Sequence, residues 1–571
     1  MFVVAIRRTG VETPETIAGL KHERTNLGRK FICDIHYDGT RFQLRTIHDE
    51  LALIDAALSD AEIFRLNRKQ SEGVISKSLM FGLPIYYVVR DSEVTLTTHA
   101  RLLQRVGIKL EEDPSALPEY FVYRYVSPPK TLFYGVNCIP IGGSLRFRLA
   151  GDQVKVESLI WTTVFNKSSH PLSLAESADA IAEDMRKGIR ALDSSRDQVG
   201  CLLSGGVDSS MLFKLSKDYL LLNESHSTGY PFEDQANNGE RIYAEAAAEA
   251  LGSTHHYHTF STTQFLHAVI DAVDHAEVPV VHLQSVLIEL LFGQALGPRN
   301  RIVLNGQGAD GIFGSTMMWW YQKYHRLIHS PFALLMGILG STPANRSFPY
   351  RRLYEWSRRD WSLNMGKPNH AIWMLGQVGE KTWVKEHYRV DDGEIVQNRL
   401  AAIGHFNPES VLDAFSVLDF VSDVDMTQVV WGQIAAAHGR RTHYSFNSPG
   451  LISAAVNTSW EEKLSEQKRL GRAAAERLGV PQSILARPKL SFGIPSGRWA
   501  GPRGVIEPIL KVVSPVVDVE LLRQFQGSDE KKAMIYWCWI NYAIWKRLLI
   551  NGESSQTLHA ELDGAMQGVT G

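Results

Sequence analysis

A short apolar run, a glycine turn and the start of a helix follow one another in residues 198–215, and this succession constrains the fold more than any other feature. Residues 199–203 (Val-Gly-Cys-Leu-Leu) are typical of a buried strand, and apolar residues recur with helical spacing from Met211 onward. The turn between them is Ser-Gly-Gly-Val-Asp-Ser, and its glycines let the backbone bend sharply and approach a ligand. Ser209 and Ser210 can cap the helix, whose free N–H groups then face the turn. The sequence therefore predicts an anion cradle suited to a phosphate, without the Gly-Lys-Ser/Thr ending of a P-loop.

A second glycine turn, Asn-Gly-Gln-Gly-Ala-Asp at 305–310, follows another apolar run at 301–304. Further strands are expected between the two turns at 221–229 and 255–259, with helices at about 241–251, 265–276 and 282–296. Strands that alternate with helices imply a doubly wound parallel sheet, in which ligands lie beyond the carboxyl ends of the strands. Both glycine turns are therefore predicted to lie at one edge of an α/β sheet.

The first turn resembles the pyrophosphatase loop of ATP-dependent adenylating enzymes, which cleave ATP between the α and β phosphates. In that family the loop holds pyrophosphate and its aspartate, here Asp208, reaches a magnesium ion. The second turn resembles the Ser-Gly-Glu-Gly-Ala-Asp-Glu motif of asparagine synthetases, and Asp310 falls where a second magnesium-binding aspartate would lie. Two carboxylates and phosphate oxygens make a suitable Mg²⁺ site, and the metal would neutralise charge as pyrophosphate leaves. The simpler alternatives are a turn without ligand and a turn-forming aspartate at 310.

The same resemblance implies which residues bind ATP: Leu202, Ser204, Gly205, Gly206, Val207, Asp208, Ser209, Gly229, Asn305 and Gly306. It also implies a catalytic position at Gln307, where asparagine synthetases have Glu, and this departure weakens an assignment to asparagine synthesis. Residues 484–495 match Arg-x-Lys-x-x-Phe-x-x-Pro, and Lys489 lies where relatives carry a catalytic lysine that balances charge in the transition state. An exposed loop lysine is the alternative. Residues 468–472 are similar to the family pattern Lys-x-x-Leu-Arg, with Gly471 in place of Leu.

Residues 1–165 are predicted to form a β-rich domain, with hairpins at 31–44 and 84–97 and a helix near 100–106. Residues 117–136 resemble the end of the glutaminase (Ntn-type) domain of glutamine-dependent asparagine synthetases. That glutaminase uses an N-terminal Cys as nucleophile, whereas residue 2 here is Phe, and an Asn-Gly-Glu substrate motif is absent. We therefore expect a degenerate glutaminase-like domain at 1–165, a linker near 166–171 and a synthetase domain at 172–560.

The amino-acid composition narrows the classes of protein to which this chain could belong. A chain of 571 residues with 44% hydrophobic and 21% charged residues is ordinary for a globular protein of two or more domains. Its formal charge of −2 gives no general attraction to nucleic acid or anionic membranes. Four cysteines without a CxxC pair suggest neither a zinc nor a disulfide framework, and no signal peptide or membrane span is expected, so a cytoplasmic location is predicted. Three close histidines at 255, 256 and 258 are interpreted as strand residues rather than metal ligands.

The resemblance as a whole implies an asparagine-synthetase-like amide ligase, dependent on ATP and Mg²⁺, that forms an acyl-adenylate and releases AMP and pyrophosphate. Without glutaminase activity, an amine already on the substrate is favoured, as in lasso-peptide macrolactam cyclases and β-lactam synthetases. Gln307 stands where β-lactam synthetases use Tyr, and the aromatic segment 316–405 could bind a peptide, although helix core or a nucleic-acid surface are alternatives. We expect joining of the N-terminal amine of a precursor peptide to an Asp or Glu side chain, with a leader peptidase or leader-binding protein as a further partner. A small-molecule amide or β-lactam synthetase, an ammonia-dependent asparagine synthetase and a non-catalytic scaffold remain as alternatives.

Overall fold

The first part of the chain is a sandwich of antiparallel sheets. The computed structural model describes residues 1–8, 17–27, 31–47, 49–55, 61–90, 93–231, 239–280, 282–332, 335, 348–377, 381–487, 499–501, 503–527 and 530–569. One sheet contains β1 (Phe2–Arg8), β2 (Lys21–Leu27), β3 (Phe31–Tyr37), β8 (Tyr86–Arg90), β9 (Glu93–Thr97) and β10 (Asn137–Cys138), in the order β10-β8-β9-β1-β3-β2. The other contains β4 (Phe42–Ile47), β5 (Glu50–Asp55), β6 (Ala61–Asn67), β7 (Glu72–Ser76), β11 (Ser144–Ala150) and β12 (Gln153–Ile160), in the order β12-β11-β7-β6-β5-β4.

The two faces of β1 explain why this strand is apolar throughout. Phe2, Val4 and Ile6 point into the core between the two sheets, whereas Val3 points to the opposite face and joins the core beneath the helices. A strand buried on both faces loses the usual alternation of polar and apolar residues. In β11 of the other sheet the alternation is kept, since its residues are buried and more exposed in turn.

One predicted hairpin is wrong and the other is confirmed. The strands at 31–37 and 42–47 exist, but β3 pairs with β1 and β2, and β4 pairs with β5 in the other sheet. The turn at residues 38–41 carries the chain from one sheet to the other, which a local turn signal cannot distinguish from a hairpin. The predicted pairing of β8 with β9 is confirmed as antiparallel, from Tyr86 opposite Thr97 to Arg90 opposite Glu93.

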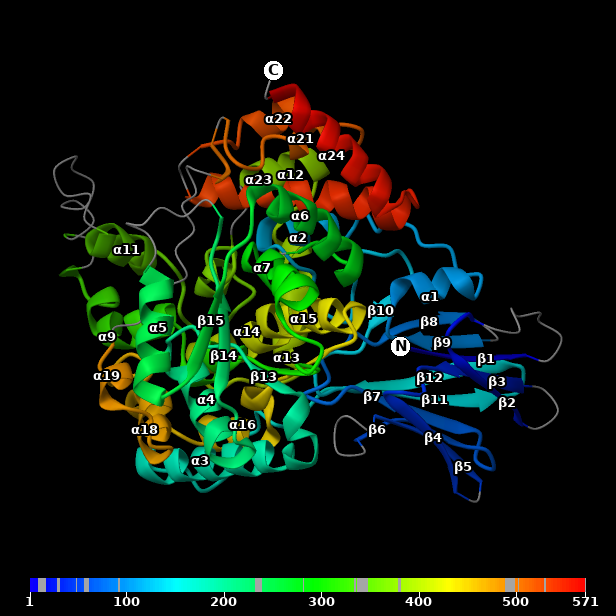
Figure 1. Cartoon of the computed structure of the whole chain (residues 1–571), viewed down its shortest axis with the longest axis horizontal. Helices are drawn as coiled ribbons and strands as arrows, with labels where there is room; N and C mark the ends of the chain where they lie inside the picture. The colour runs from blue at the N-terminus through cyan, green and yellow to red at the C-terminus, as the bar shows by residue number, and fades with distance from the viewer. Residues whose placement is uncertain are drawn as a thin grey trace.

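The second part of the chain contains parallel strands covered by helices, so the predicted mixed α/β class is confirmed (Figure 1). Its strands are β13 (Val199–Cys201), β14 (Glu224–Thr228), β15 (Thr254–His258), β16 (Ile302–Leu304) and β17 (Arg441–His443). β13 pairs with β16 and β16 with β17, all parallel, and β14 pairs in parallel with β15. A parallel bridge between Leu202 and His226 joins the two groups. The resulting order is β15-β14-β13-β16-β17. From β13, the chain adds β14 and β15 on one side of the sheet and then β16 and β17 on the other, so the strand order reverses between β13 and β16.

Helices fill the connections, and the helices predicted from Met211 onward and at about 241–251, 265–276 and 282–296 are found. Their bounds are α3 (Leu174–Arg190), α4 (Val207–Leu220), α5 (Gly239–Leu251), α6 (Thr262–Ala276) and α7 (Gln284–Leu290), which continues as a π-helical turn at Leu291–Ala295. α3 starts with a capping box in which Ser173 and Glu176 bond each other's backbone N–H groups.

Further helices lie after β16, and the last of them, coloured orange and red, lie at the top of the molecule in Figure 1. After β16 come α8 (Ala309–Phe313), α9 (Thr316–Ile328), α11 (Phe348–Ser357), α12 (Lys381–Tyr388), α13 (Asp392–Gly404), α14 (Val411–Asp419) and α15 (Asp425–Ala437). After β17 come α16 (Pro449–Val456), α17 (Trp460–Lys463), α18 (Arg469–Arg477), α19 (Gln482–Leu485), α21 (Ile509–Val513), α22 (Val519–Arg523), α23 (Glu530–Trp545) and α24 (Ser555–Val569). The helical character predicted for 316–405 is thus seen in its described parts.

The two parts share one apolar core. A single cluster of buried side chains includes Val3 of β1, residues of α1 (Ala100–Arg105) and α2 (Leu117–Tyr123), and residues of α23. Tyr120 donates its hydroxyl to the carbonyl oxygen of Cys538 (2.9 Å), and the buried Lys77 ammonium lies 2.6 Å from the Asp425 carboxylate. Residues 117–136 therefore pack into the second half of the chain rather than forming a free linker.

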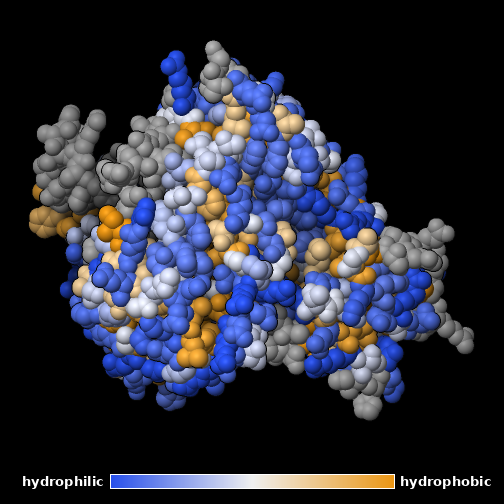
Figure 2. Space-filling view, in the orientation of Figure 1, coloured by the Kyte–Doolittle hydropathy of each residue, from blue (hydrophilic) through white to orange (hydrophobic). Residues whose placement is uncertain are grey.

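The face of the molecule seen in Figure 2 is mainly polar. Hydrophilic residues cover most of the face in Figure 2, and apolar residues gather in smaller patches between them. Within the described ranges, we find no helix with both the length and the apolar character needed to cross a bilayer.

Glu277, which ends α6, connects the second half of the chain to the first. Its buried carboxylate accepts the backbone N–H groups of Ala100 (2.5 Å) and Arg101 (3.4 Å). These residues begin α1, whose N-cap residue, His99, makes no capping bond with its side chain. The carboxylate therefore caps α1 from a distant part of the chain.

This contact predicts a dependence of stability on pH. Burial raises the pKa of Glu277 from its ordinary value of 4.5 to about 7. A raised pKa means that stability is greatest below the unfolded-state value and is lost as the pH rises through the folded-state value. Glu277→Gln keeps an acceptor oxygen without the charge. The free energy of unfolding of this variant should therefore rise by about 3 kcal/mol relative to that of the wild type as the pH increases from 4.5 to 7. Denaturation by urea at several pH values measures this, and a difference that does not change with pH would contradict the prediction.

Candidate active site

The first glycine turn passes close to the backbone of Tyr243 and is bonded by the Ser209 hydroxyl. Gly205 has φ +76°, and a Cβ there would lie 2.2 Å from the carbonyl oxygen of Tyr243 in α5, so only glycine fits. Ser209 Oγ accepts the N–H of Ser204 (3.2 Å) and donates to the carbonyl oxygen of Gly206 (3.2 Å). The hydroxyl of Ser209 therefore ties the turn to the start of α4.

The predicted capping of α4 by Ser209 and Ser210 is wrong. The N-cap residue is Gly206, and no side chain caps the helix, because both serines already lie within its first turn. Ser210 Oγ is buried without a hydrogen-bond partner among the described residues. The first N–H groups of α4 are consequently left for a ligand to bind, and the helix dipole favours an anion there.

The second glycine turn lies directly against the first. An ideal Cβ on Gly306 would lie 3.4 Å from Cβ of Asp208, an ordinary van der Waals contact. The Oδ1 atom of Asn305 accepts the N–H of Gln307 (3.0 Å), which shapes the turn before α8. Gly308 has φ +94°, and a Cβ there would lie 2.3 Å from Oδ1 of Asn447. Both turns follow the carboxyl ends of adjacent strands, β13 and β16, where the sheet order reverses.

Lys468 joins the two aspartates that the sequence assigned to a metal. Its Nζ lies 2.5 Å from Oδ2 of Asp208 and also forms an ion pair with Oδ1 of Asp310. The side chain reaches this position from the residue before α18, which has φ +56° and is only 7% exposed. Burial alone would lower the pKa of Lys468, but the two carboxylates outweigh burial and raise that pKa above its ordinary range. Sequence reasoning noted the Lys-x-x-Leu-Arg pattern without assigning this contact.

The residues between the two turns fit a divalent cation. Asp208 and Asp310 are close enough to share one ammonium, and Oδ1 of Asp208 is buried without a hydrogen-bond partner among the described residues. Nδ2 of Asn305, a donor that suits a phosphate oxygen rather than the cation, is also buried and has no hydrogen-bond partner among the described residues. Carboxylate oxygens are the ligands that Mg²⁺ prefers. The Lys468 ammonium thus lies where positive charge is already stabilised.

Further predicted residues lie around this edge of the sheet. Leu202 forms the bridge from β13 to β14, Val207 begins α4, and Gly229 directly follows β14. Arg487 stacks its guanidinium 3.5 Å from the centre of the Tyr243 ring and donates to the carbonyl oxygen of Ser204 (3.5 Å). Residue 487 is therefore next to the first turn, whereas Lys489 lies outside the described residues.

A second charged group, which sequence reasoning missed, lies near Asp310. Asp423 accepts a hydrogen bond from Nε2 of His282 (2.9 Å) and lies 3.8 Å from the guanidinium of Arg124. Burial raises the pKa of Asp423, but the charge and hydrogen bond of His282 outweigh burial and lower it, while the charge of Asp310 acts in the opposite direction. The π-helical turn that carries Asp423, Phe420–Val424, gives no signal in sequence periodicity.

The first half of the chain offers no ionised thiol. Phe2 is fully buried, and its N–H donates to Oγ1 of Thr98 (3.1 Å). The cysteines of the sequence are Cys33, Cys138, Cys201 and Cys538, and burial raises the pKa of every one. A thiol with a raised pKa is a poor nucleophile at neutral pH.

The histidines at 255, 256 and 258 are strand residues of β15, as interpreted. His255 is hydrogen-bonded through both ring nitrogens to Ser225 and Ser227 of the neighbouring strand (2.9 and 2.8 Å). The rings of His226, His256 and His258 lie against one another, with ring centroids 5.2, 5.4 and 6.4 Å apart. The ring nitrogens of His255 are thus used within the sheet.

Comparison with known proteins identifies the family of the chain. The family model for asparagine synthase matches residues 181–545, which is more than half of the chain. An asparagine synthetase (glutamine-hydrolyzing) of Bacillus subtilis is 26% identical over 454 residues, covering 73% of this chain and 65% of that relative, just under two thirds. A protein of Mycobacterium bovis whose assigned name is also asparagine synthetase (glutamine-hydrolyzing) is 29% identical over 482 residues, covering 79% of this chain and 70% of the relative. The matched region contains both glycine turns and Lys468, and the chain belongs to the asparagine synthase family, whose members are ATP-dependent ligases.

Proposed function

We propose that this protein forms amide bonds at the expense of ATP, through an acyl-adenylate, with release of AMP and pyrophosphate. The observation that carries the proposal is the meeting of Asp208 and Asp310 on Lys468, between two glycine turns at the carboxyl edge of a parallel sheet. Ligand sites in such sheets lie where the strand order reverses. The first turn corresponds in this proposal to the pyrophosphatase loop.

The residues around the two glycine turns would have separate roles in forming the acyl-adenylate. A substrate carboxylate oxygen attacks the α-phosphorus of ATP, the bond to the bridging oxygen of the β-phosphate breaks, and pyrophosphate leaves. Asp208 and Asp310 would hold Mg²⁺, which supplies charge neutralisation for the departing phosphates. The N–H groups at the start of α4 bind the pyrophosphate oxygens. Lys468 keeps a positive charge beside the same oxygens, and Lys489 is assigned to the acyl carbonyl and α-phosphate.

The second step joins an amine to the activated acyl carbon, and AMP leaves with the bonding electron pair. The amine loses a proton in this step, and Gln307 lies in the second turn, where its amide can orient the amine. We propose that the amine belongs to the substrate, because burial raises the pKa of all four cysteines and makes these thiols poor nucleophiles for releasing ammonia from glutamine. Holding both groups on one molecule also removes the entropy cost of a separate encounter.

A peptide substrate is favoured by the surface next to this edge. α9 begins at Thr316, only six positions after Asp310, and carries partly buried aromatic rings at Trp319, Trp320 and Tyr324. Its end borders an open hollow of about 530 Å³, lined by His329, Arg359, Asp360, Trp361, Ser362 and Asn369. We therefore propose macrolactam closure of a lasso-type precursor peptide as the specific reaction. The names of the relatives favour a second candidate, asparagine synthesis, for which we propose free ammonia as the amine in this chain.

Mass spectrometry of a defined reaction tests the proposal. The full-length protein is incubated with Mg-ATP and the precursor peptide encoded nearest to it, after removal of its leader by the companion protease. We expect a product lighter by one water together with stoichiometric AMP. AMP formed only with aspartate and ammonium would establish the second candidate, and AMP formed only with a small β-amino acid would establish a small-molecule synthetase. Absence of AMP and pyrophosphate with all three substrates would overturn the ligase proposal and favour a scaffold.

A further inference from the structure

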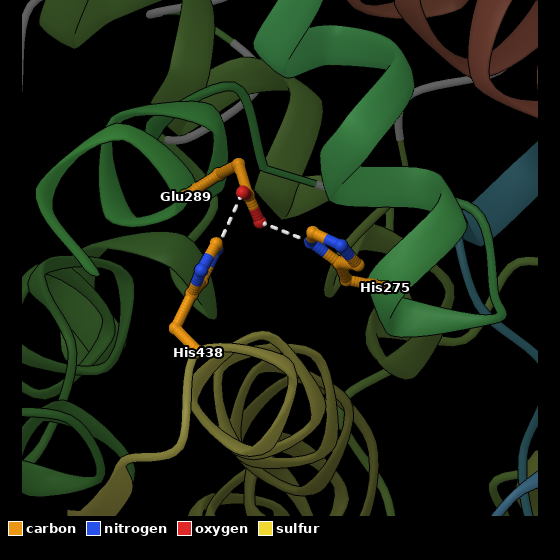
Figure 3. A group of neighbouring side chains, drawn as sticks. All are labelled: His275, Glu289 and His438. Atoms are coloured by element: carbon orange, nitrogen blue, oxygen red, sulfur yellow. Dashed lines mark hydrogen bonds and ion pairs between the residues drawn. The ribbon is translucent and has the colours of Figure 1, made fainter. Parts of the chain in front are cut away.

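Three side chains from separate helices converge on one point far from the glycine turns. His275 lies in the last turn of α6, Glu289 in α7, and His438 directly after α15. The Oε2 atom of Glu289 accepts a hydrogen bond from Nδ1 of His275 (2.9 Å), and Oε1 accepts one from Nε2 of His438 (2.6 Å). Figure 3 shows the carboxylate between the two imidazole rings. One ligand atom from each residue lies within 4.8 Å of the others.

We propose that His275, Glu289 and His438 form a binding site for a divalent transition metal, with Zn²⁺ as the expected ion. Two imidazole nitrogens and one carboxylate are a ligand set that Zn²⁺ binds with high affinity, whereas Mg²⁺ and Ca²⁺ prefer oxygen ligands alone. The site is independent of the proposed ligase reaction, because it shares no residue with the glycine turns.

The surroundings suit a bound cation. Glu289 is only 5% exposed, and the negative charges of Asp271 and Asp274 lie close to His275. Both imidazole rings are partly exposed, at 30% for His275 and 21% for His438, so water can reach a fourth coordination position. Metal–ligand bonds of about 2.0–2.1 Å in a tetrahedron place ligand atoms about 3.3 Å apart. The imidazole nitrogens, now 2.9 and 2.6 Å from the carboxylate oxygens, would therefore move away from them by roughly half an ångström, and ligand atoms that lie up to 4.8 Å apart would move closer together.

The backbone around His438 is already fixed in place. A Cβ on Gly293 would lie 2.8 Å from Cε1 of His438, so glycine at 293 is what lets the ring approach α7. Arg440, two residues after His438, donates to the carbonyl oxygens of Phe292 (2.9 Å) and Asn300 (2.6 Å). These hydrogen bonds connect the segment before β17 to the π-helical turn at the end of α7 and the loop after it. Little ordering of the backbone is therefore needed when the metal binds.

The position of the site indicates a structural role. His438 precedes β17, so the site lies at the amino end of the parallel strands, whereas both glycine turns lie at their carboxyl ends. A metal here would fasten α6, α7 and α15 to one another without contacting ATP. We expect its removal to lower the melting temperature and to leave ATP–pyrophosphate exchange unchanged at a temperature where the protein stays folded.

Metal binding to the full-length protein tests the inference. Protein stripped with a chelator is titrated with Co²⁺, and the visible absorption of four- or five-coordinate cobalt is followed, with zinc content measured after reloading. We expect one metal ion per chain, and Glu289→Gln and His438→Gln should each weaken binding by at least about tenfold. His256→Gln, in the histidine stack of β15, is the matched control and should bind like the wild type.

The alternative is a hydrogen-bonded triad that never binds a metal. Wild-type protein without stoichiometric metal binding, or variants at 289 and 438 that bind as tightly as the wild type, would establish that alternative. If these variants fail to fold, X-ray absorption spectra of the zinc-loaded wild type decide the question. Two imidazoles and oxygen around zinc support the site, and a zinc shell without imidazole overturns it. Because none of these measurements depends on ligase activity, failure of this site and failure of the proposed function are distinguishable.

Discussion

Replacing Asp208 with asparagine is expected to lower the rate of ATP–pyrophosphate exchange by at least about a thousandfold, or about 4 kcal/mol of transition-state stabilisation. Asparagine has nearly the same shape but lacks the negative charge that holds Mg²⁺ and faces Lys468. The loss therefore reports on charge at the site rather than on packing. Exchange of labelled pyrophosphate into ATP, measured with each candidate carboxylate substrate, gives the rate.

The same helix provides a matched control for Asp208. Asp218 lies near the end of α4 and forms an exposed ion pair with Lys214 (2.5 Å), a type of contact that contributes little to stability. Asp218→Asn should exchange pyrophosphate at the wild-type rate. If Asp208→Asn stays within tenfold of that control while its circular dichroism is unchanged, Asp208 has no role in phosphate chemistry and the proposed metal site is wrong.

Replacing Lys468 with methionine should both destabilise the protein and change its response to Mg²⁺. Without the ammonium, Asp208 and Asp310 lose the cation that they share, and because the Asp310 side chain is 52% exposed the loss should cost only about 1–2 kcal/mol. The two carboxylates then form a stronger cation site, so added Mg²⁺ should raise the melting temperature of the variant more than that of the wild type. Pyrophosphate exchange should fall at least about a hundredfold, because the positive charge beside the leaving group is lost.

The loss of stability in Lys468→Met should depend on pH in a defined way. Since the carboxylates raise the pKa of Lys468, its contribution to stability is fully present below the unfolded-state value and lost only above the folded-state one. The stability difference between Lys468→Met and the wild type should thus be constant from neutral pH to about pH 10. Arg477→Met, at the exposed end of α18, should show neither effect. An equal shift in melting temperature with Mg²⁺ for Lys468→Met and wild type would show that the lysine does not occupy the cation site.

Local features of this fold could be predicted because local chemistry determines them. The strand, glycine turn and helix at 198–215 are specified by neighbouring residues. Gly205 has a positive φ, which glycine adopts more freely than any other residue. Pairing over long distances could not be predicted in the same way. The turn after β3 has the composition of a hairpin turn, yet the chain changes sheets there. Which strands pair depends on the apolar faces of both sheets together.

The candidate site shows the same limit. Asp208 and Asp310 could be placed because each follows a recognisable strand and glycine turn. Lys468 lies 260 residues beyond Asp208, and its side chain reaches the site only because residue 468 adopts a left-handed conformation before α18. Neither property has a signature in composition or periodicity. The role of Lys489 stays a prediction, as do the separate contributions of Leu202, Val207 and Gly229 to ATP binding.

The apolar cluster that contains both Val3 and the residues of α23 has a consequence for anyone who wishes to shorten this chain. A gene fragment that starts at the linker near residue 170 would encode every residue proposed for catalysis, yet it would expose the surfaces against which α2 and β1 now pack. Expression of that fragment should yield aggregated protein. The first 165 residues thus cover apolar surface of the second half of the chain, and this packing alone gives them a structural role.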